Sequence, residues 1–523
     1  MQKVENFLFK NIFWIILLLS VPAIWALFVP GFYGASDDLH IAWLQQMDAT
    51  IRAGQFPPRF VPDLSFGFGY PLFNFVFPLP FYIGEVFHLL GFSLVGSVKA
   101  VFLLSIPLSG WFMYRFLREH ASEWLALAGA MVYIYTPYRS TDIYVRGAFG
   151  EALAFIFPPL IAWAITKLSK GKSWKWVGVL GLGIAGLILS HNIMAYMFIH
   201  FLLILSLIIG FKIRTFLGFT LGLLISIYFW LPAIVESGLM KYDTVFNFID
   251  HYPTLKQLIT PFFGYGASVA GPYDGMSFFL GLINIVLVVS ALMLFKKLNK
   301  ISVWALGIIA ISVFMMNFRS IFIWNMVPLI PYFQFPWRFL SLTTFATSIL
   351  VIIFDKFNFG KYIGMAVVFG AVILNFTFFR PHDFLGRTDE YYLNRYIPVP
   401  VATEEYLKTG EEYLRLPKAT EKRPTEVSPD KKLNSSFEVN LTASKVVDYY
   451  KYYFPGWEVK IDGKKVEAYA GKPYGQIEFN VPAGKHQVNI AFRETLFRKV
   501  LNIISLFSLI FVVVIIVKKN KKT

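Results

Sequence analysis

The chain of 523 residues is too apolar and too poor in charge for a soluble globular protein. It is 56% hydrophobic, and only 15% of its residues are charged, against roughly 25% in soluble domains. The net charge of +16 does not indicate nucleic-acid binding, because Lys and Arg cluster between apolar runs, as topology signals do. The absence of cysteine excludes disulfides and thiolate metal sites. We therefore expect an integral membrane protein.

About twelve apolar runs approach the length needed to cross roughly 30 Å of hydrocarbon. The first follows Lys3 and Lys10 like a signal peptide, but no clear small-residue cleavage site comes after it, so we expect it to be retained as a span. The run 176–211 exceeds one crossing and is divided at His191. The expected spans lie near residues 11–30, 98–117, 123–137, 151–167, 176–190, 193–211, 215–233, 276–295, 302–318, 338–355, 361–379 and 498–517.

The distribution of Lys and Arg predicts the topology. If the N-terminus is cytoplasmic, the basic clusters fall in the cytoplasmic connections, in agreement with the positive-inside rule. The tail Lys518 to Lys522 then requires an even number of spans. We expect both termini of this plasma-membrane protein to be cytoplasmic and the long segments 31–97 and 380–497 to be extracytoplasmic.

The segment 380–497 has the pattern of a separate extracytoplasmic domain. Its first part is polar and contains several prolines, which predicts an irregular linker. Alternation in "WEVKIDGKKVEAY" around Asp462-Gly463 predicts a hairpin, and "QIEFNVPAGKHQVNIAF" adds two β runs around Gly484. We expect a small β-sandwich in an otherwise all-α polytopic protein. The expected regions are a membrane domain at 1–379, a linker at 380–433, a β domain at 434–497, and the last span with its tail at 498–523.

In the segment 31–97, residues 37–53 are expected to form a helix in the membrane interface. Ser36 suits the N-cap, and Gly54 followed by two prolines ends the helix. A helical period places an apolar stripe on one side and the acids Asp37 and Asp38 on the other. Capping of the helix by itself accounts for acids at this position.

Other polar residues fall in or next to the connections on the same side. Each has a structural explanation by itself: a helix cap, a snorkelling arginine or a hydrogen-bonded packing histidine. Together they suggest arginines that hold a phosphate and a carboxylate that takes a proton from a hydroxyl. These two tasks describe glycosyl transfer from a lipid phosphate-linked sugar. The residues are Arg59, Tyr144, Arg146, Glu151, His191 and Arg338.

Six stretches also resemble a known family across nearly the whole chain. They are "SDDLHIAW", "RAGQFPPRFVPDLSFGFGYPLFNFVFPLP", "YVRGAFGE", "LSHN", "FQFPWRF" and "YYKYYFPGWEVKIDGKKV". The sequence resembles the bacterial 6-pyruvoyl-tetrahydropterin synthase-related, YfhO-like membrane proteins. That group is similar to the GT-C superfamily of membrane glycosyltransferases, which use polyprenyl-phosphate sugars. The pterin label implies no pterin chemistry, because the chain has no His-rich zinc constellation.

The resemblance implies roles for individual residues. GT-C enzymes place their catalytic base in the first outer loop, where Asp37 and Asp38 match, for an inverting attack on the sugar. Donor phosphate would lie against Arg59, Arg146 and Arg338. Substrate would contact Tyr144, Glu151 and His191, and also His40, which lies nearer the apolar stripe and suits packing. Many GT-C enzymes have Asp-Glu where this chain has Asp-Asp, so the resemblance assigns neither the base nor a cofactor and leaves a divalent cation open.

Two other functions stay open at this point. A lipid or glycolipid transporter or flippase would suit the many spans, but ionisable residues are nearly absent from their centres, where transport pathways usually place some. A non-catalytic protein could bind envelope glycans through its β domain. The leading hypothesis has as partners a lipid-linked sugar donor, a cell-envelope glycan, lipid or protein acceptor and membrane lipids, but no nucleic acid.

Overall fold

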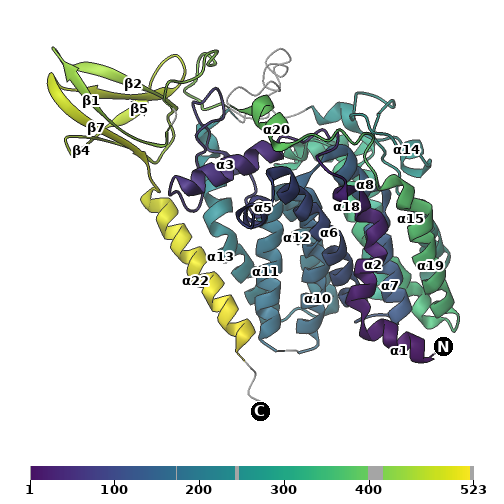
Figure 1. Cartoon of the computed structure of the whole chain (residues 1–523). Helices are drawn as coiled ribbons and strands as arrows, with labels where there is room; N and C mark the ends of the chain where they lie inside the picture. Colours follow the sequence, from purple (N-terminus) through teal and green to yellow (C-terminus); the bar gives the residue numbers. More distant parts are fainter. Residues whose placement is uncertain (1, 172, 242–246, 398–415, 431, 519–523) are drawn as a thin grey trace.

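The computed structural model is mostly helical and carries a small β domain at one end of its long helices (Figure 1). It describes all residues except 1, 172, 242–246, 398–415, 431 and 519–523. We call the end that carries the β domain the β-domain end. Helix α1 and the last turns of α22 lie at the opposite end (Figure 1).

The helices follow one another with short breaks. The first half contains α1 (Gln2–Lys10), α2 (Ile12–Ile24), α3 (His40–Arg52), α4 (Leu72–Phe75), α5 (Leu79–Leu89), α6 (Leu94–Leu117), α7 (Glu123–Tyr135), α8 (Pro137–Ser140), α9 (Phe149–Ala154), α10 (Phe157–Ser169), α11 (Lys175–Ser190), α12 (Asn192–Ile209) and α13 (Ile213–Glu236). The second half contains α14 (Leu255–Ile259), α15 (Leu282–Met293), α16 (Lys300–Met315), α17 (Ile321–Met326), α18 (Leu340–Ile349), α19 (Gly360–Asn375), α20 (Asp389–Tyr396) and α22 (Leu496–Val517).

Within the described residues, seven helices are long and apolar enough to cross a membrane, or up to eight if the pair α16–α17, bent by 90°, is one span. Helices lie at all twelve expected positions, but the expected twelve spans are not confirmed. Four of the apolar helices are shorter, such as α7 with 13 residues. At about 1.5 Å per residue, a helix of that length covers only about 20 Å of the hydrocarbon.

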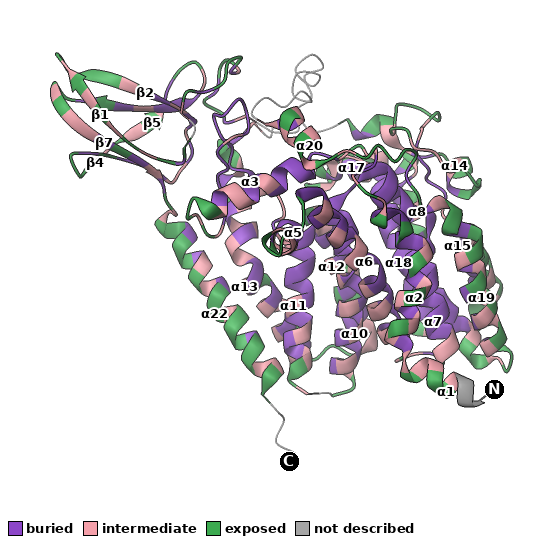
Figure 2. Ribbon diagram, in the orientation of Figure 1, coloured by how far each residue is buried: buried purple, intermediate pink, exposed green. Residues whose placement is uncertain are grey.

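The interior of the helical part is built around the stretch Pro336–Lys356, which is buried from Pro336 to Ile353 (Figure 2). Its hydroxyls, such as those of Ser341 and Thr344, donate to carbonyls one turn back, so these polar groups are satisfied inside the core. Asn284 of α15 donates to Thr136 and to Thr347, which joins three segments of the core. Helix α22 lies at the periphery and is mostly exposed (Figure 2).

The β domain consists of two antiparallel sheets, with strand orders β1-β7-β3-β4 and β2-β6-β5. The predicted hairpin at Asp462-Gly463 is confirmed: Ile461 pairs with Lys464, and both turn residues have positive φ, as a primed turn requires. The two strands around Gly484 are also present, but they belong to different sheets. The strands are β1 (Asn434–Leu441), β2 (Lys445–Tyr452), β3 (Trp457–Ile461), β4 (Lys464–Val466), β5 (Ala468–Ala470), β6 (Gln476–Val481) and β7 (Gly484–Phe492).

The segment expected to be an irregular linker contains a helix, α20. Asp389 and Glu390 occupy its first turn, where acids are favourable, and Tyr392 and Tyr396 share its buried face one turn apart. The Asp389 carboxylate accepts hydrogen bonds from the N–H groups of Leu94 and Val95, 2.8 and 2.9 Å away, at the start of α6. Residues 398–415 of the expected linker lie outside the described residues.

The β domain contacts the segment that precedes α4. The Lys451 ammonium group is fully buried and donates to the carbonyl oxygens of Pro62 and Gly67, 2.9 and 2.6 Å away. The ring of Phe68 packs against Tyr452 at 5.4 Å and Tyr474 at 5.7 Å. These contacts hold the chain that follows α3 against the β domain.

Candidate functional site

The turn before α3 is attached to the chain around Arg146. The expected helix 37–53 begins only at His40, because residues 36–39 form a turn. In this turn the backbone N–H of Asp37 donates to the carbonyl oxygen of Arg146, 2.7 Å away. Gly147 has φ +68°, and a Cβ atom added to Gly147 would lie only 3.0 Å from the Cβ atom of Ala35. A glycine therefore lets the two segments approach and brings Asp37 beside Arg146.

The two adjacent acids have different surroundings. Asp38 is 7% exposed; it accepts a hydrogen bond from the Tyr396 hydroxyl of α20, and Arg387 lies 3.6 Å away. Burial raises the pKa of Asp38 despite the opposing effect of Tyr396 and the nearby arginines. The Asp37 carboxylate is only half-buried and accepts no hydrogen bond from the described residues. Of the two acids, Asp37 is therefore the one whose carboxylate oxygens are free of hydrogen bonds from the described residues.

Arg146 ends a single π-helical stretch, Thr141–Arg146, a conformation that is frequent at functional sites. Its Nη1 donates to Asp142 and to Glu151, each 2.8 Å away. The Tyr138 hydroxyl donates to the other oxygen of Glu151, 2.5 Å away. Within the described part of the chain, every side-chain hydrogen bond of Arg146 leaves from Nη1. Its Nε and Nη2 are therefore free to bind a ligand.

Arg338 lies in the 3-10 turn Pro336–Phe339, ahead of α18. Its Nη1 donates to the carbonyl oxygen of Phe333, 3.0 Å away, whereas its Nε is buried without a partner among the described residues. The charges of Arg146, Glu151 and Asp37 act on this guanidinium. Arg338 therefore lies within electrostatic range of Arg146, Glu151 and Asp37, and it keeps an unpaired donor.

Two histidines complete this cluster. His191 lies at the break between α11 and α12, where its Nδ1 accepts a hydrogen bond from the Met194 N–H, 3.2 Å away. In the neutral ring Nε2 then carries the proton and can donate it to a ligand. His40 packs against Phe149 with ring centroids 5.6 Å apart, and burial lowers its pKa to about 4, so its ring is neutral at pH 7.

The structure thus brings together five of the nine residues selected from the sequence and places His40 at their edge. We call the five residues Asp37, Arg146, Glu151, His191 and Arg338 the turn cluster. Tyr144 is not part of it: its hydroxyl donates to the carbonyl oxygen of Ala23, 2.7 Å away, inside the core. Asp38 contacts α20 instead.

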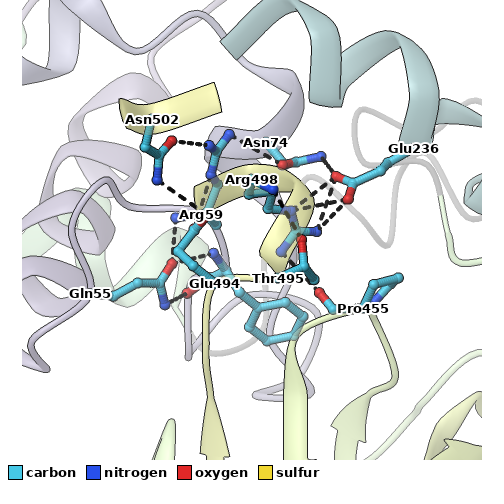
Figure 3. Close-up of polar contacts among 10 residues, drawn as sticks. Gln55, Arg59, Asn74, Glu236, Pro455, Glu494, Thr495, Arg498 and Asn502 are labelled. Carbon is cyan, nitrogen blue, oxygen red and sulfur yellow. Dashed lines mark hydrogen bonds and ion pairs between the residues drawn. The ribbon is translucent and has the colours of Figure 1, made fainter. Parts of the chain in front are cut away.

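Arg59 lies in a separate network (Figure 3). Its Nε, Nη1 and Nη2 donate to Glu494, Asn74 and Asn502 at 3.2, 3.4 and 3.1 Å. All three of its nitrogens are thus engaged. Next to it, Arg498 at the start of α22 pairs with Glu236 at the end of α13, with N–O distances of 3.0 to 3.2 Å. We call Arg59, Asn74, Glu236, Glu494, Arg498 and Asn502 the joint cluster.

Sequence reasoning assigned no role to several residues that shape the turn cluster, although Asp142 stood out as one of the polar residues in the connection that contains Arg146. Tyr138 and Asp142 lie in the same short segment as Arg146, and a tyrosine and an acid at helical spacing from an arginine were the available signal. Trp337 precedes Arg338, and the Arg146 guanidinium lies 4.8 Å from the centre of its ring. Tyr396 carried no signal, because 358 residues separate it from Asp38.

No group of three or more His, Asp or Glu side chains that could hold a metal ion occurs in the described ranges of the chain. The divalent cation left open by the sequence is therefore not assigned to any residues.

No family model matches the chain. It is 26% identical over 259 residues to an uncharacterized protein of Lactococcus lactis subsp. cremoris. The match covers 46% of this chain and 42% of the Lactococcus protein, so this chain spans less than half the length of that relative. The resemblance to the 6-pyruvoyl-tetrahydropterin synthase-related proteins is not confirmed by either result.

Among solved structures, the chain is similar to the arabinofuranosyltransferase AftD from Mycobacteria, with a TM-score of 0.46 and 13% identity over 76% of this chain and 28% of that one. A mutant of the same enzyme matches with the same score and identity over 71% and 28%. The chain thus corresponds to less than a third of AftD, and similarity at this score decides neither fold nor function.

Proposed function

We propose that this protein is a membrane glycosyltransferase that moves a sugar from a polyprenyl-phosphate carrier to a cell-envelope acceptor. The observation that supports the proposal is the turn cluster: Asp37, whose carboxylate accepts no hydrogen bond from the described residues, lies beside Arg146, and the charges of both act on Arg338, whose Nε is buried without a partner among the described residues. Buried donors without partners are costly in a folded protein, so a ligand that accepted a hydrogen bond from Arg338 Nε would offset that cost. Arginine N–H groups suit a phosphate.

In this proposal Asp37 takes the proton of the acceptor hydroxyl. The acceptor oxygen forms a bond to the anomeric carbon while the bond from that carbon to the phosphate oxygen breaks on the opposite face. The electron pair leaves with the polyprenyl phosphate, and the configuration at the anomeric carbon inverts. Arg146 and Arg338 stabilise the negative charge that develops on the departing phosphate.

The other residues have supporting tasks. Glu151 orients Arg146 through its ion pair and is itself held by Tyr138. His191 presents its Nε2–H to a sugar hydroxyl, and the neutral His40 packs beside Asp37. Asp38 positions the turn through Tyr396, while Arg59 and Tyr144 support the fold.

We propose that the β-domain end faces the cell exterior. The turn cluster belongs to segments at this end, and α1 and the last turns of α22 lie at the other (Figure 1). The basic clusters expected on the cytoplasmic side by the positive-inside rule support this orientation.

The test compares Asp37→Asn with the matched control Asp38→Asn. Full-length protein in membrane vesicles is supplied with a panel of radiolabelled polyprenyl-phosphate sugars, and label in envelope glycan, lipid and protein is counted. We expect Asp37→Asn to lose at least about 100-fold in transfer, because a general base contributes about 10² to 10⁴. Asp38→Asn should retain most activity.

Full transfer by Asp37→Asn at wild-type expression would overturn the proposal. Movement of labelled lipid across the membrane without any transfer would favour the flippase.

A further inference from the structure

The next inference rests on the proposed function and concerns the loop between α13 and α15. Three side chains of this loop meet at Trp337, which follows it by about 60 residues. The Trp337 indole N–H donates to the hydroxyl of Ser268, 3.2 Å away, and that hydroxyl donates to Asp274, 3.0 Å away. His251 Nδ1 lies 2.9 Å from the same hydroxyl.

The single hydroxyl proton of Ser268 determines the direction of these bonds. Because it goes to Asp274, the Ser268 oxygen accepts from both Trp337 and His251, and His251 therefore carries a proton on Nδ1. Asp274 is fixed in turn by the Val269 N–H at 3.0 Å and by Gln257 at 2.8 Å. Ser268 thus has its full set of hydrogen bonds and anchors the indole to the loop.

Trp337 is the surface on which Arg146 rests. The indole is 2% exposed and stacks on Phe335 with ring centroids 4.7 Å apart. The Arg146 guanidinium lies 4.8 Å from the indole centre, within the range of a cation–π contact. Nε1 is the one hydrogen-bond donor of an indole, so the bond to Ser268 is the one hydrogen bond that orients this ring, in addition to its packing against Phe335 and Phe278.

The position of Arg146 matters because its guanidinium could instead form a two-pronged ion pair with Asp142. Asp142 accepts from Arg146 through Oδ1, while its Oδ2 is buried and has no partner among the described residues. Arginine and carboxylate favour a two-pronged pair with two parallel hydrogen bonds. If the guanidinium left the indole face and turned, it could form that pair with Asp142, and a donor now free for phosphate would be lost.

We propose that Ser268 and Asp274 are positioning residues for the donor phosphate. They hold Trp337 in the orientation that keeps Arg146 from pairing fully with Asp142, so that Nε and Nη2 stay available to the polyprenyl phosphate. The loop between α13 and α15 thereby controls affinity for the donor without touching it.

The test measures binding of undecaprenyl phosphate to the full-length protein in detergent by native mass spectrometry or calorimetry. Ser268→Ala should weaken binding about 5- to 20-fold, whereas Ser268→Thr, which restores a hydroxyl, should recover most of the loss. The matched control is Ser277→Ala, which removes another hydroxyl of this loop, one that donates to the carbonyl oxygen of Phe262 and not to Trp337. This control should bind like wild type.

A second variant, Trp337→Phe, keeps an aromatic face and removes the N–H. It should lose affinity at least as far as Ser268→Ala, together with some fall in melting temperature because the smaller ring leaves a cavity. In transfer assays Ser268→Ala should raise KM for the donor and leave KM for the acceptor unchanged, which general destabilisation would not do.

The outcomes separate the two proposals. Failure of the wild type to bind undecaprenyl phosphate would overturn the proposed function. If the wild type binds and Ser268→Ala binds equally well, only the positioning role is overturned. The same holds if Ser277→Ala loses as much affinity as Ser268→Ala.

Discussion

The joint cluster and the turn cluster are both buried groups of arginines and carboxylates, yet they differ in how their hydrogen bonds are used. In the joint cluster, Arg59 engages all three of its guanidinium nitrogens, and Arg498 does the same with Glu236 and the carbonyl oxygen of Pro455 (Figure 3). In the turn cluster, Arg146 uses one nitrogen and Arg338 keeps a buried Nε unpaired.

This difference is the one that the proposed function predicts between a structural network and a ligand site. A saturated network ties its elements together, here the chain after α3, the end of α13 and the start of α22. An unpaired buried donor costs about 1 to 3 kcal/mol, and a protein retains that cost where a ligand offsets it.

The largest expected effect on stability lies in the joint cluster. Glu236→Gln or Arg498→Leu alone leaves one charge buried without its partner and should destabilise the protein by about 3 to 5 kcal/mol. The double variant Glu236→Leu/Arg498→Leu removes both charges and should recover much of that loss. Thermal unfolding in detergent measures all three. If the single and double variants melt like wild type, the joint cluster is not a structural network.

The next effect is on function and compares the substitution of Arg146 in the turn cluster with that of Arg59 in the joint cluster. Arg146→Gln should weaken binding of undecaprenyl phosphate by about 100-fold, because a charge-assisted bond to phosphate contributes about 1.5 to 3 kcal/mol and is lost with the charge. Arg59→Gln should lower the melting temperature and keep the affinity. The reverse pattern would mean that the phosphate binds at the joint cluster.

The smallest effect concerns the pH dependence of stability. The pKa of His40 is about 4 in the folded protein and about 6.5 in an unfolded chain. As pH falls from 6.5 to 4, the unfolded chain binds a proton that the folded protein does not, so stability is lost, by about 3 kcal/mol in total. His40→Phe should remove this part of the loss, as measured by unfolding at pH 7, 5 and 4.

His486 is the control with the opposite sign. It is half-buried and hydrogen-bonded to Asp462, which raises its pKa. Its contribution to stability is present below about pH 6.5 and is lost as pH rises through the higher folded pKa. His486→Asn should therefore lose stability at acidic pH, where His40→Phe gains relative to wild type. Equal pH profiles for wild type and His40→Phe would show that folding does not lower the pKa of His40.

Local patterns in the sequence predicted the features that depend on neighbouring residues. The apolar runs predicted a helix at each of twelve positions, and Asp462-Gly463 predicted its hairpin because those two residues tolerate positive φ. Lengths were less well predicted, because breaks inside apolar runs, such as the 90° bend between α16 and α17, depend on packing. Helix α20 was missed, since its buried face is recognisable only once α3 lies beneath it.

The amino-acid sequence by itself determined that this is a helical membrane protein with a small β domain, and it selected Asp37, Arg146 and Arg338 among the candidate residues. Only the tertiary structure decided that Asp38 is engaged by Tyr396 and that Arg59 is engaged by Glu494 and Asn502. The physical reason is that a residue type specifies which hydrogen bonds a side chain can make. Whether a bond is already taken depends on partners hundreds of residues away, and these meet only in the folded chain.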